Sequence, residues 1–451
     1  MNKQVFQMRK LATAIVATLA MAGGNAMAAV SAEEAARLGA DLTPIGAEKA
    51  GNADGSIPAW DGGMTESVTQ GDNPFADEKP LYVITNANKE QYKDLLTPGQ
   101  IALFERYPDT YQMPVYQTRR TAAYPEVIYE KAKNNATKAV IREQVAFDYD
   151  ESVPFAIPQN AEEIVWNHLL RYRGGSVKRD LMQAAVQRNG DYTAVKLADE
   201  FVFPWHIADG YDPEKDANVL FYFKQVIKAP ARLTGTVLLV HETLDQIKQP
   251  RLAWIYNAGQ RRVRRAPQIA YDGPGTASDG LRTSDNFDMF NGAIDKYDWK
   301  LVGKKELLIP YNSFKLADKS LKYDDILMAG HVNPEFTRYE KHRVWVVEAN
   351  LSEGERHIYG KRVFYIDEDT WGIAVADHYD GRGELWRVSE GHEIQYTEAK
   401  VPWNAAEIIH DLQSGRYLAL GLTNEEKGLN FDHKAKHRDF TPSALRRAAK
   451  R

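Results

Sequence analysis

The chain contains no cysteine. A disulfide framework is therefore excluded, and the folded chain has to draw its stability from a hydrophobic core. A lipid anchor attached to a cysteine is excluded for the same reason. Long apolar runs are scarce as well, since mean hydropathy is −0.50. Beyond residue 28, no segment approaches the roughly 20 apolar residues that a membrane-spanning helix needs.

An excess of basic charge is also missing. Lys and Arg number 57 against 62 Asp and Glu, which gives a formal net charge of −5. Because binding to nucleic-acid phosphates needs a basic face, we do not expect nucleic acid as a partner.

The familiar catalytic motifs are absent. His241-Glu242 and His392-Glu393 each lack the second histidine of a zinc hydrolase motif, and no G-x-S-x-G nucleophile turn occurs. Gly273 and Gly275 stand in a predicted loop, outside the strand-to-helix context of a dinucleotide site. We therefore expect no catalytic residues, no cofactor and no metal. An ester hydrolase is the least favoured alternative, because no nucleophile and base can be named. It stays open, because a site assembled from distant residues would leave no local motif.

One acidic triplet, Asp367-Glu368-Asp369, is a candidate for a cation site. It lacks the D-x-D-x-D-G spacing and the distal glutamate of a calcium loop. Because it stands between two predicted strands, the pattern favours a solvated hairpin turn.

The N-terminus has the pattern of a secretory signal peptide. A basic region with Lys3, Arg9 and Lys10 precedes an apolar stretch, which ends in Ala26-Met27-Ala28. We expect cleavage after about Ala28 and a periplasmic protein that is not a lipoprotein. Cleavage would change the formal net charge from −5 to −8, because three basic residues and no acidic ones are removed. An outer-membrane barrel is disfavoured, because many predicted strands are apolar on both faces.

The rest of the chain divides into three predicted parts. Residues 29–115 contain a short helix at 31–39, a turn-rich arm at 41–80, and helical patterns at 87–96 and 98–106. Residues 116–432 form the main domain, with helices at 125–134 and 159–172. Residues 433–451 are a basic tail that would either contact anionic lipid or be disordered.

The main domain shows the pattern of an antiparallel meander. Predicted strands are separated by polar turns at intervals of 8–14 residues, and Asn189-Gly190 is a strong hairpin signal. They cover 180–187, 191–203, 219–228, 232–244, 251–256, 260–265, 299–308, 343–350, 357–367, 371–379 and 384–390, with a loop at 266–295. Because no helices alternate with these strands, a parallel sheet is disfavoured. We predict an α+β, β-rich fold.

Several of these strands are apolar on both faces. Trp254 and Tyr256 point to one side of their strand, while Ala253 and Ile255 point to the other. A sheet that faced water would alternate apolar with polar residues. One face therefore packs on helices, and the other packs on more protein or on an apolar ligand.

The densest basic run is Arg261-Arg262-Val263-Arg264-Arg265. Arg261, Arg262, Arg264 and Arg265 are candidates for contact with an anionic headgroup or with the acidic face of a partner. The structural alternative is a solvated edge strand, whose charges prevent aggregation.

Three stretches together resemble a known family. They are RLAWIYNAGQRRVRR at 251–265, DWKLVGKKELLIPYN at 298–312, and RVFYIDEDTW at 362–371 with the later Asp377-His-Tyr-Asp380 and Trp386. With the Gly-, Asn- and Asp-rich arm at 51–63, they are similar to a proteobacterial periplasmic family of unknown function. That family is similar to outer-membrane lipoprotein-sorting carriers of the LolA and LolB type. The sequence departs from LolA in its length and its N-terminal arm, so the resemblance does not specify lipoprotein as the cargo.

The resemblance implies a strongly curved, unclosed antiparallel sheet, a half-barrel, with helices on the concave side and an irregular N-terminal arm. It also implies a carrier for a hydrophobic ligand, such as a lipid or an acyl chain. The candidates for the lining are aromatic: Trp254, Tyr256, Trp345, Tyr365 and Trp371. Partners would be an exporter of the resistance-nodulation-division type and an outer-membrane protein. The alternative is a structural adaptor that binds both of these partners.

Overall fold

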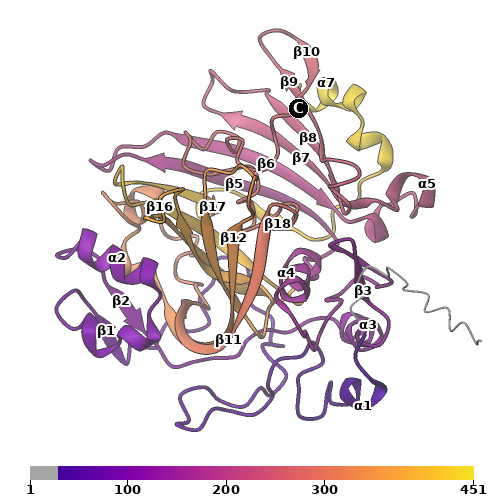
Figure 1. Cartoon of the computed structure of the whole chain (residues 1–451). Helices are drawn as coiled ribbons and strands as arrows, with labels where there is room; N and C mark the ends of the chain where they lie inside the picture. Colours follow the sequence, from indigo (N-terminus) through magenta and orange to yellow (C-terminus); the bar gives the residue numbers. More distant parts are fainter. Residues whose placement is uncertain (1–28, 451) are drawn as a thin grey trace, which may run out of the picture.

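The computed structural model describes residues 29–450 (Figure 1). The predicted signal peptide, residues 1–28, lies outside the described residues. Among residues 29–450, no helix has both the length and the apolar character needed to cross a lipid bilayer.

A 16-stranded sheet, open along both edges, forms the framework. It consists of two antiparallel meanders that are joined side by side where β17 pairs with β5. The first meander contains β5 (Ser176–Val186), β6 (Ala194–Val202), β7 (Val219–Ala229), β8 (Val237–Thr243), β9 (Leu252–Asn257) and β10 (Arg262–Arg265). The second contains β11 (Tyr297–Pro310), β12 (Tyr339–Leu351), β13 (Lys361–Asp367), β14 (Ile373–Tyr379), β15 (Leu385–Tyr396), β16 (Val401–Asp411) and β17 (Arg416–Leu422).

Short strands extend the sheet. They are β1 (Tyr82–Ile84), β2 (Met113–Val115) and β18 (Gly428–Asn430), while β3 (Val140–Arg142) and β4 (Val145–Phe147) form a separate pair. β2 pairs with β12, so the segment before residue 116 is hydrogen-bonded into the same sheet as the predicted main domain. The predicted unclosed antiparallel sheet is confirmed, and the Asn189-Gly190 turn joins β5 to β6. The strands at 401–411 and 416–422 were not predicted.

Seven α-helices lie around the sheet in the described part of the chain. They are α1 (Ala32–Ala35), α2 (Pro98–Arg106), α3 (Glu126–Ala136), α4 (Ala161–Leu170), α5 (Pro213–Asp216), α6 (Tyr323–Ile326) and α7 (Leu445–Ala448). The predicted helix at 87–96 is wrong, because this stretch forms two short 3-10 turns. No residue of either turn is buried, so no apolar face stabilises a longer helix.

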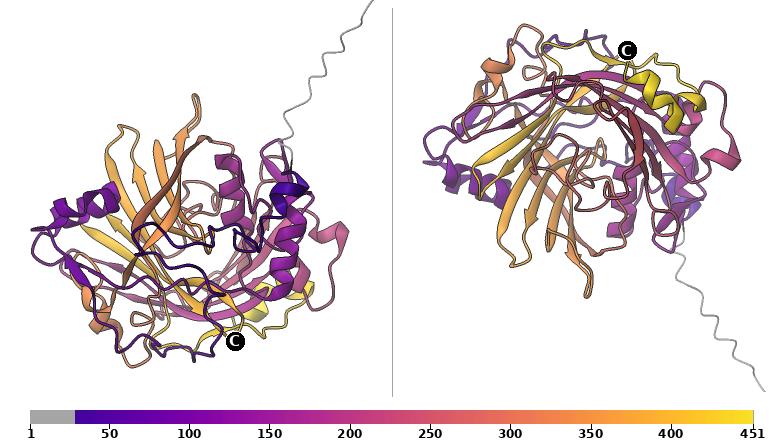
Figure 2. Two further views of the ribbon diagram at one scale, coloured as in Figure 1. Left: turned by 90° about the horizontal axis from the view of Figure 1, so that it is seen from below. Right: turned by 90° about the horizontal axis from the view of Figure 1, so that it is seen from above.

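The two faces of the curved sheet are covered differently (Figure 2). Helix α4 packs on the concave face, where its Ile164, Val165 and Leu169 join the largest apolar cluster. Helix α2 packs on the outer face through Leu103 and Phe104. Thus α4 lies on the concave side, where helices were predicted, whereas α2 lies on the outer face.

The basic tail also packs on the outer face of the first meander. Phe440 and Leu445 are buried against Tyr222, Leu239 and other residues of β6 to β9. The prediction of a disordered tail is wrong, because these two apolar side chains anchor it to the sheet.

The contact between α2 and the sheet includes a buried carboxyl group, Glu390. It accepts hydrogen bonds from Gln100 Nε2 (3.3 Å) and from the Tyr339 hydroxyl (3.0 Å). Burial raises the pKa of Glu390 to about 7. The native state therefore retains a proton that the unfolded chain loses near its ordinary pKa of 4.5. The stability that protonated Glu390 contributes to the native state is complete below about pH 4.5. It is lost as the pH rises to about 7.

We expect Glu390→Gln to stabilise the chain above pH 7 by on the order of 3 kcal/mol, with no gain near pH 4.5. Urea denaturation at both pH values measures this difference. Glu384→Gln, in the exposed turn before β15, is the control and should be neutral at both. A Glu390→Gln chain that is less stable than wild type at pH 8 would contradict the assignment.

Candidate ligand-binding site

A topological feature places one long segment across the concave side of the sheet. β10 and β11 are consecutive in the chain but lie at opposite ends of the strand order, where β11 pairs only with β12. Their connection, residues 266–296, therefore has to cross from one edge of the open sheet to the other. We call it the crossing segment. It contains no helix or strand, and connections this long without secondary structure are usually functional or disordered.

The crossing segment covers an apolar wall on β7 and β8. Phe221, Phe223, Leu238 and Val240 form this phenylalanine wall, and Phe287 of the crossing segment faces it. The strand register explains the wall: Phe221 pairs with Glu242, Phe223 with Val240, and Gln225 with Leu238. Paired residues point to the same face, and alternate residues such as Tyr222 point to the other.

A small cavity remains between the wall and the crossing segment. Its volume is about 50 Å³, which is room for one or two water molecules. Pockets that hold small ligands measure roughly 300–1,000 Å³. A ligand on this wall would therefore have to displace the crossing segment.

Buried ion pairs hold the crossing segment in place. Asp288 accepts from Arg171 Nη2 (2.9 Å) and from Arg173 Nη1 (2.6 Å), both of which follow α4 in the sequence. Asp285 accepts from Arg362 Nη2 of β13 at 2.6 Å. Burial opposes ionisation of Asp288, but Arg171 and Arg173 outweigh it and hold its pKa at about 2.

The backbone of the crossing segment has unusual conformations. Five of its non-glycine residues have φ between 47° and 65°, in the left-handed region: Tyr271, Ala277, Asp279, Asp288 and Met289. Such conformations cost energy for side chains other than glycine and often occur at ligand clamps and switch regions. The ion pairs therefore hold a segment with a strained backbone.

The cavity also contains a charge. Arg282 of the crossing segment is 6% exposed, and its Nε atom has no hydrogen-bond partner among residues 29–450. Burial lowers the pKa of its guanidinium. Arg251 lines the same cavity but is neutralised, because its Nε donates to Glu242 at 2.8 Å.

Sequence comparison places this fold in a family. A family model described as "Protein of unknown function (DUF1329)" matches residues 83–446. The chain belongs to this family. It is 60% identical over 440 residues to the uncharacterized protein PA3922 of Pseudomonas aeruginosa, and the match covers 96% of each chain.

Solved structures give a similar result. A putative outer membrane lipoprotein-sorting protein domain from Vibrio parahaemolyticus matches with a TM-score of 0.43 and 16% identity, over 63% of this chain and 97% of that one. A DUF1329 family protein from Desulfovibrio piger matches with a TM-score of 0.42 and 16% identity, over 60% and 91%. The LolA superfamily protein NE2245 from Nitrosomonas europaea matches with a TM-score of 0.37 and 13% identity, over 63% and 98%. The family model confirms the family of unknown function to which the sequence was found similar.

The five aromatic residues predicted to bind the ligand do not come together. Trp254 and Tyr256 pack on the outer face, beneath the C-terminal tail. Tyr365 is also on the outer face, in the cluster under α2. Trp345 and Trp371 stack on each other at 6.4 Å in the concave core. None of the five lines the cavity on the phenylalanine wall.

Strand pairing explains this separation. Trp254 pairs with Leu239 and Tyr256 with Val237, so both share the outer face with these β8 residues. Trp371 is fully buried in the turn between β13 and β14, and its Nε1 donates to the Ile45 carbonyl at 2.9 Å. The alternating pattern identified which residues share a face, but it could not show which face is concave.

The arginine run lies at the edge of the sheet. β10 is the last strand of its meander, and Arg261, Arg262, Arg264 and Arg265 are all exposed. This position agrees with the structural alternative of a charged, solvated edge strand. Contact with an anion or a partner stays a prediction.

The acidic triplet is buried, so the prediction of a solvated turn is wrong. Asp367, Glu368 and Asp369 are only 2–3% exposed. Arg120 donates to both oxygens of Asp369 (2.8 and 2.6 Å), and Lys304 lies 2.6 Å from Glu368. Burial is tolerated because basic groups from distant segments neutralise these carboxylates.

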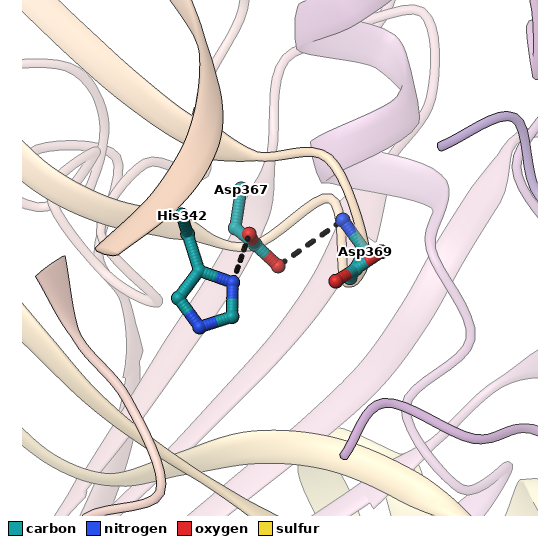
Figure 3. A group of neighbouring side chains, drawn as sticks. All are labelled: His342, Asp367 and Asp369. Atoms are coloured by element: carbon teal, nitrogen blue, oxygen red, sulfur yellow. Dashed lines mark hydrogen bonds and ion pairs between the residues drawn. The ribbon is translucent and has the colours of Figure 1, made fainter. Parts of the chain in front are cut away.

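Within residues 29–450, the metal-ligand atoms of His342, Asp367 and Asp369 come within 4.8 Å of one another. Figure 3 shows the three side chains converging. His342 Nδ1 lies 3.5 Å from Asp367 Oδ1, and Asp367 Oδ2 accepts from the backbone N–H of Asp369 at 3.2 Å. Burial raises the pKa of Asp367 well above its usual range. Because Arg120 already donates to both oxygens of Asp369, this geometry favours a buried ion-pair cluster over a metal centre.

Sequence analysis missed the residues that line the cavity. Phe221 and Phe223 stood in a correctly predicted strand without any sign that they face a ligand. Arg282 and Phe287 stood in the predicted loop at 266–295. The length of that loop was the one available signal, because long irregular connections are often functional.

Proposed function

We propose that this chain is a periplasmic binding protein for a hydrophobic ligand, which it carries across the envelope. The observation that carries the proposal is the phenylalanine wall, covered by an irregular segment and not by a helix or a strand. An apolar wall on the concave side of an open sheet can bury an acyl chain, at about 0.8 kcal/mol per CH₂. The LolA-like resemblance of the family and the predicted signal peptide support the same proposal.

In the proposed mechanism, the crossing segment lies closed on the phenylalanine wall until a ligand binds. The cavity of about 50 Å³ is too small for an acyl chain. Ligand binding displaces the crossing segment from the wall, and the apolar chain takes the place of side chains such as Phe287. The ion pairs of Asp285 and Asp288 set the free energy needed to open the site. No covalent chemistry is required.

Substitution of the wall tests this proposal. In delipidated protein titrated with a fluorescent fatty acid, we expect Val240→Phe to weaken binding at least about tenfold, or 1.4 kcal/mol. The larger ring occupies space on the wall that the acyl chain needs. Val237→Phe makes the same change on the outer face of the same strand, so it controls for overpacking. Circular dichroism checks that both variants fold, and equal binding by the two would contradict the proposal.

An exporter and an outer-membrane protein remain the proposed partners, and the structural adaptor is the second candidate. The specific observation in its favour is a pair of exposed large apolar side chains, Trp205 and Tyr211, at 40% and 46% exposure. Exposed apolar side chains that lie together often mark interaction sites. Trp205 and Tyr211 line the same surface hollow, whose volume is about 190 Å³.

A further inference from the structure

Arg282 differs from the other buried arginines of the described chain. Ten arginines are buried, and nine of them form an ion pair with a carboxylate within 4.0 Å: Arg120, Arg171, Arg173, Arg179, Arg251, Arg338, Arg343, Arg362 and Arg387. Within residues 29–450, Arg282 is the one buried arginine without such a pair. An unpaired buried charge is costly, so proteins rarely retain one without a counter-ion.

Glu407, Asp199 and Asp285 are the carboxyl groups that favour the charge of Arg282, and each of them is hydrogen-bonded to another group. Asp199 accepts from Arg179 at 3.0 Å and from Gln225 at 3.0 Å. Asp285 is paired with Arg362, as described above. Glu407 accepts from the backbone N–H of Met289 at 3.1 Å, and burial raises its pKa to about 7. Within residues 29–450, Arg282 therefore has carboxylates nearby that favour its charge but no direct ion-pair partner, which leaves that position open to an anionic ligand.

The residues around the cavity leave space for the guanidinium of Arg282. Its guanidinium lies 5.5 Å from the centre of the Phe287 ring. A Cβ atom on Gly275 would come within 2.9 Å of the guanidinium carbon, so the glycine leaves room for this group. Gly275, Arg282 and Phe287 line the same cavity as the phenylalanine wall. A cation thus lies beside a surface suited to an apolar chain.

We propose that Arg282 binds the oxyanion headgroup of an amphiphile whose apolar chain lies against the phenylalanine wall. This inference rests on the proposed function and specifies the class of ligand. A guanidinium matches a carboxylate or a phosphate through two parallel hydrogen bonds. A neutral lipid of the same chain length would bury the same apolar area but would leave the guanidinium unpaired.

Competition between ligands of equal chain length tests the proposal. A fluorescent fatty acid bound to the delipidated full chain is displaced with hexadecanoate, hexadecyl phosphate or hexadecanol. We expect at least one of the two anions to compete at least tenfold better than hexadecanol. Their order distinguishes a carboxylate from a phosphate headgroup. Equal competition by all three would overturn the role of Arg282 but leave the proposed function intact.

Variants locate the headgroup. In Arg282→Gln, the better anion should displace the fluorescent fatty acid no better than hexadecanol does. The affinity for hexadecanol should stay unchanged. Arg264→Gln, on the exposed edge strand, should retain the wild-type preference. Loss of the preference in Arg264→Gln alone would overturn the proposal and place the headgroup at β10. Absence of binding by every amphiphile would overturn the proposed function and this inference with it.

Thermal unfolding separates a ligand contact from a structural role. Arg282→Gln removes an unpaired buried charge, so the ligand-free variant should melt at or above the wild-type temperature. Addition of the preferred anion should raise the melting temperature of the wild type but raise that of Arg282→Gln less. A ligand-free variant that melts well below wild type would show a structural role and overturn the proposal.

Discussion

Replacement of Asp288 by asparagine is expected to destabilise the folded chain by roughly 3–5 kcal/mol. The substitution leaves Arg171 and Arg173 buried without their carboxylate, at contacts of 2.9 and 2.6 Å. Since Arg171 and Arg173 hold the pKa of Asp288 at about 2, the stabilising charge is present above the ordinary pKa of 3.8. This stability is lost as the pH falls through about 2. Urea denaturation at neutral pH measures the difference.

The Asp288 variant should also loosen the crossing segment. Relative to wild type, we expect hydrogen exchange to become faster in residues 266–296 and to change less in β12 to β16. The reason is that the ion pair fixes the segment to the region of α4. Asp279→Asn is the matched control: it lies in the same segment, but its side chain is 64% exposed and it pairs with Arg416. Exposed pairs contribute about 0–1 kcal/mol. If the two variants lose equal stability, Asp288 does not hold the segment closed.

Replacement of Arg120 by methionine should produce a loss of similar size, roughly 3–5 kcal/mol. Arg120 is the cation that faces Asp369, and its Nη2 also donates to the Glu48 carbonyl at 2.8 Å. Its Nη1 donates to the carbonyls of Lys49 and Pro58, both at 3.3 Å. The variant therefore leaves a carboxylate buried and releases the N-terminal arm from the turn between β13 and β14.

The neighbouring residue supplies the control for this prediction. Arg119 pairs with Glu78 at the surface, where its side chain is 49% exposed. We expect Arg119→Met to change stability by at most about 1 kcal/mol. Limited proteolysis should cleave the arm at residues 48–58 faster in Arg120→Met than in Arg119→Met. Indistinguishable denaturation curves for the two variants would show that the buried cluster does not fix the arm.

Local signals in the sequence were sufficient for much of the sheet. The period-two pattern of residues 219–228 and 251–256 located β7 and β9 to within a residue or two, because apolar alternation and turn residues are properties of short segments. Pro98, at the first position of the helix, likewise marks the start of α2. The open antiparallel architecture followed from the order of these elements together with the family resemblance.

The candidate site is formed by contacts between residues that are distant in sequence, so no short segment predicts it. The loop at 266–295 was predicted, but its path across the concave side follows from β10 and β11 lying at opposite edges, which is a property of the whole sheet. The sequence predicts a solvated turn at Asp367 and Asp369, because Arg120, which neutralises Asp369, is distant in sequence. Trp254 was assigned to the lining because the pattern cannot tell a concave face from an outer one.

Native mass spectrometry of the chain, expressed with its N-terminal segment and purified without delipidation, tests the central claim most directly. We predict a co-purifying amphiphile with an anionic headgroup, near one molecule per chain, that lipid extraction removes and hexadecanoate or hexadecyl phosphate replaces. A chain that stays free of ligand as purified, and also after incubation with these amphiphiles, would contradict a hydrophobic ligand-binding function.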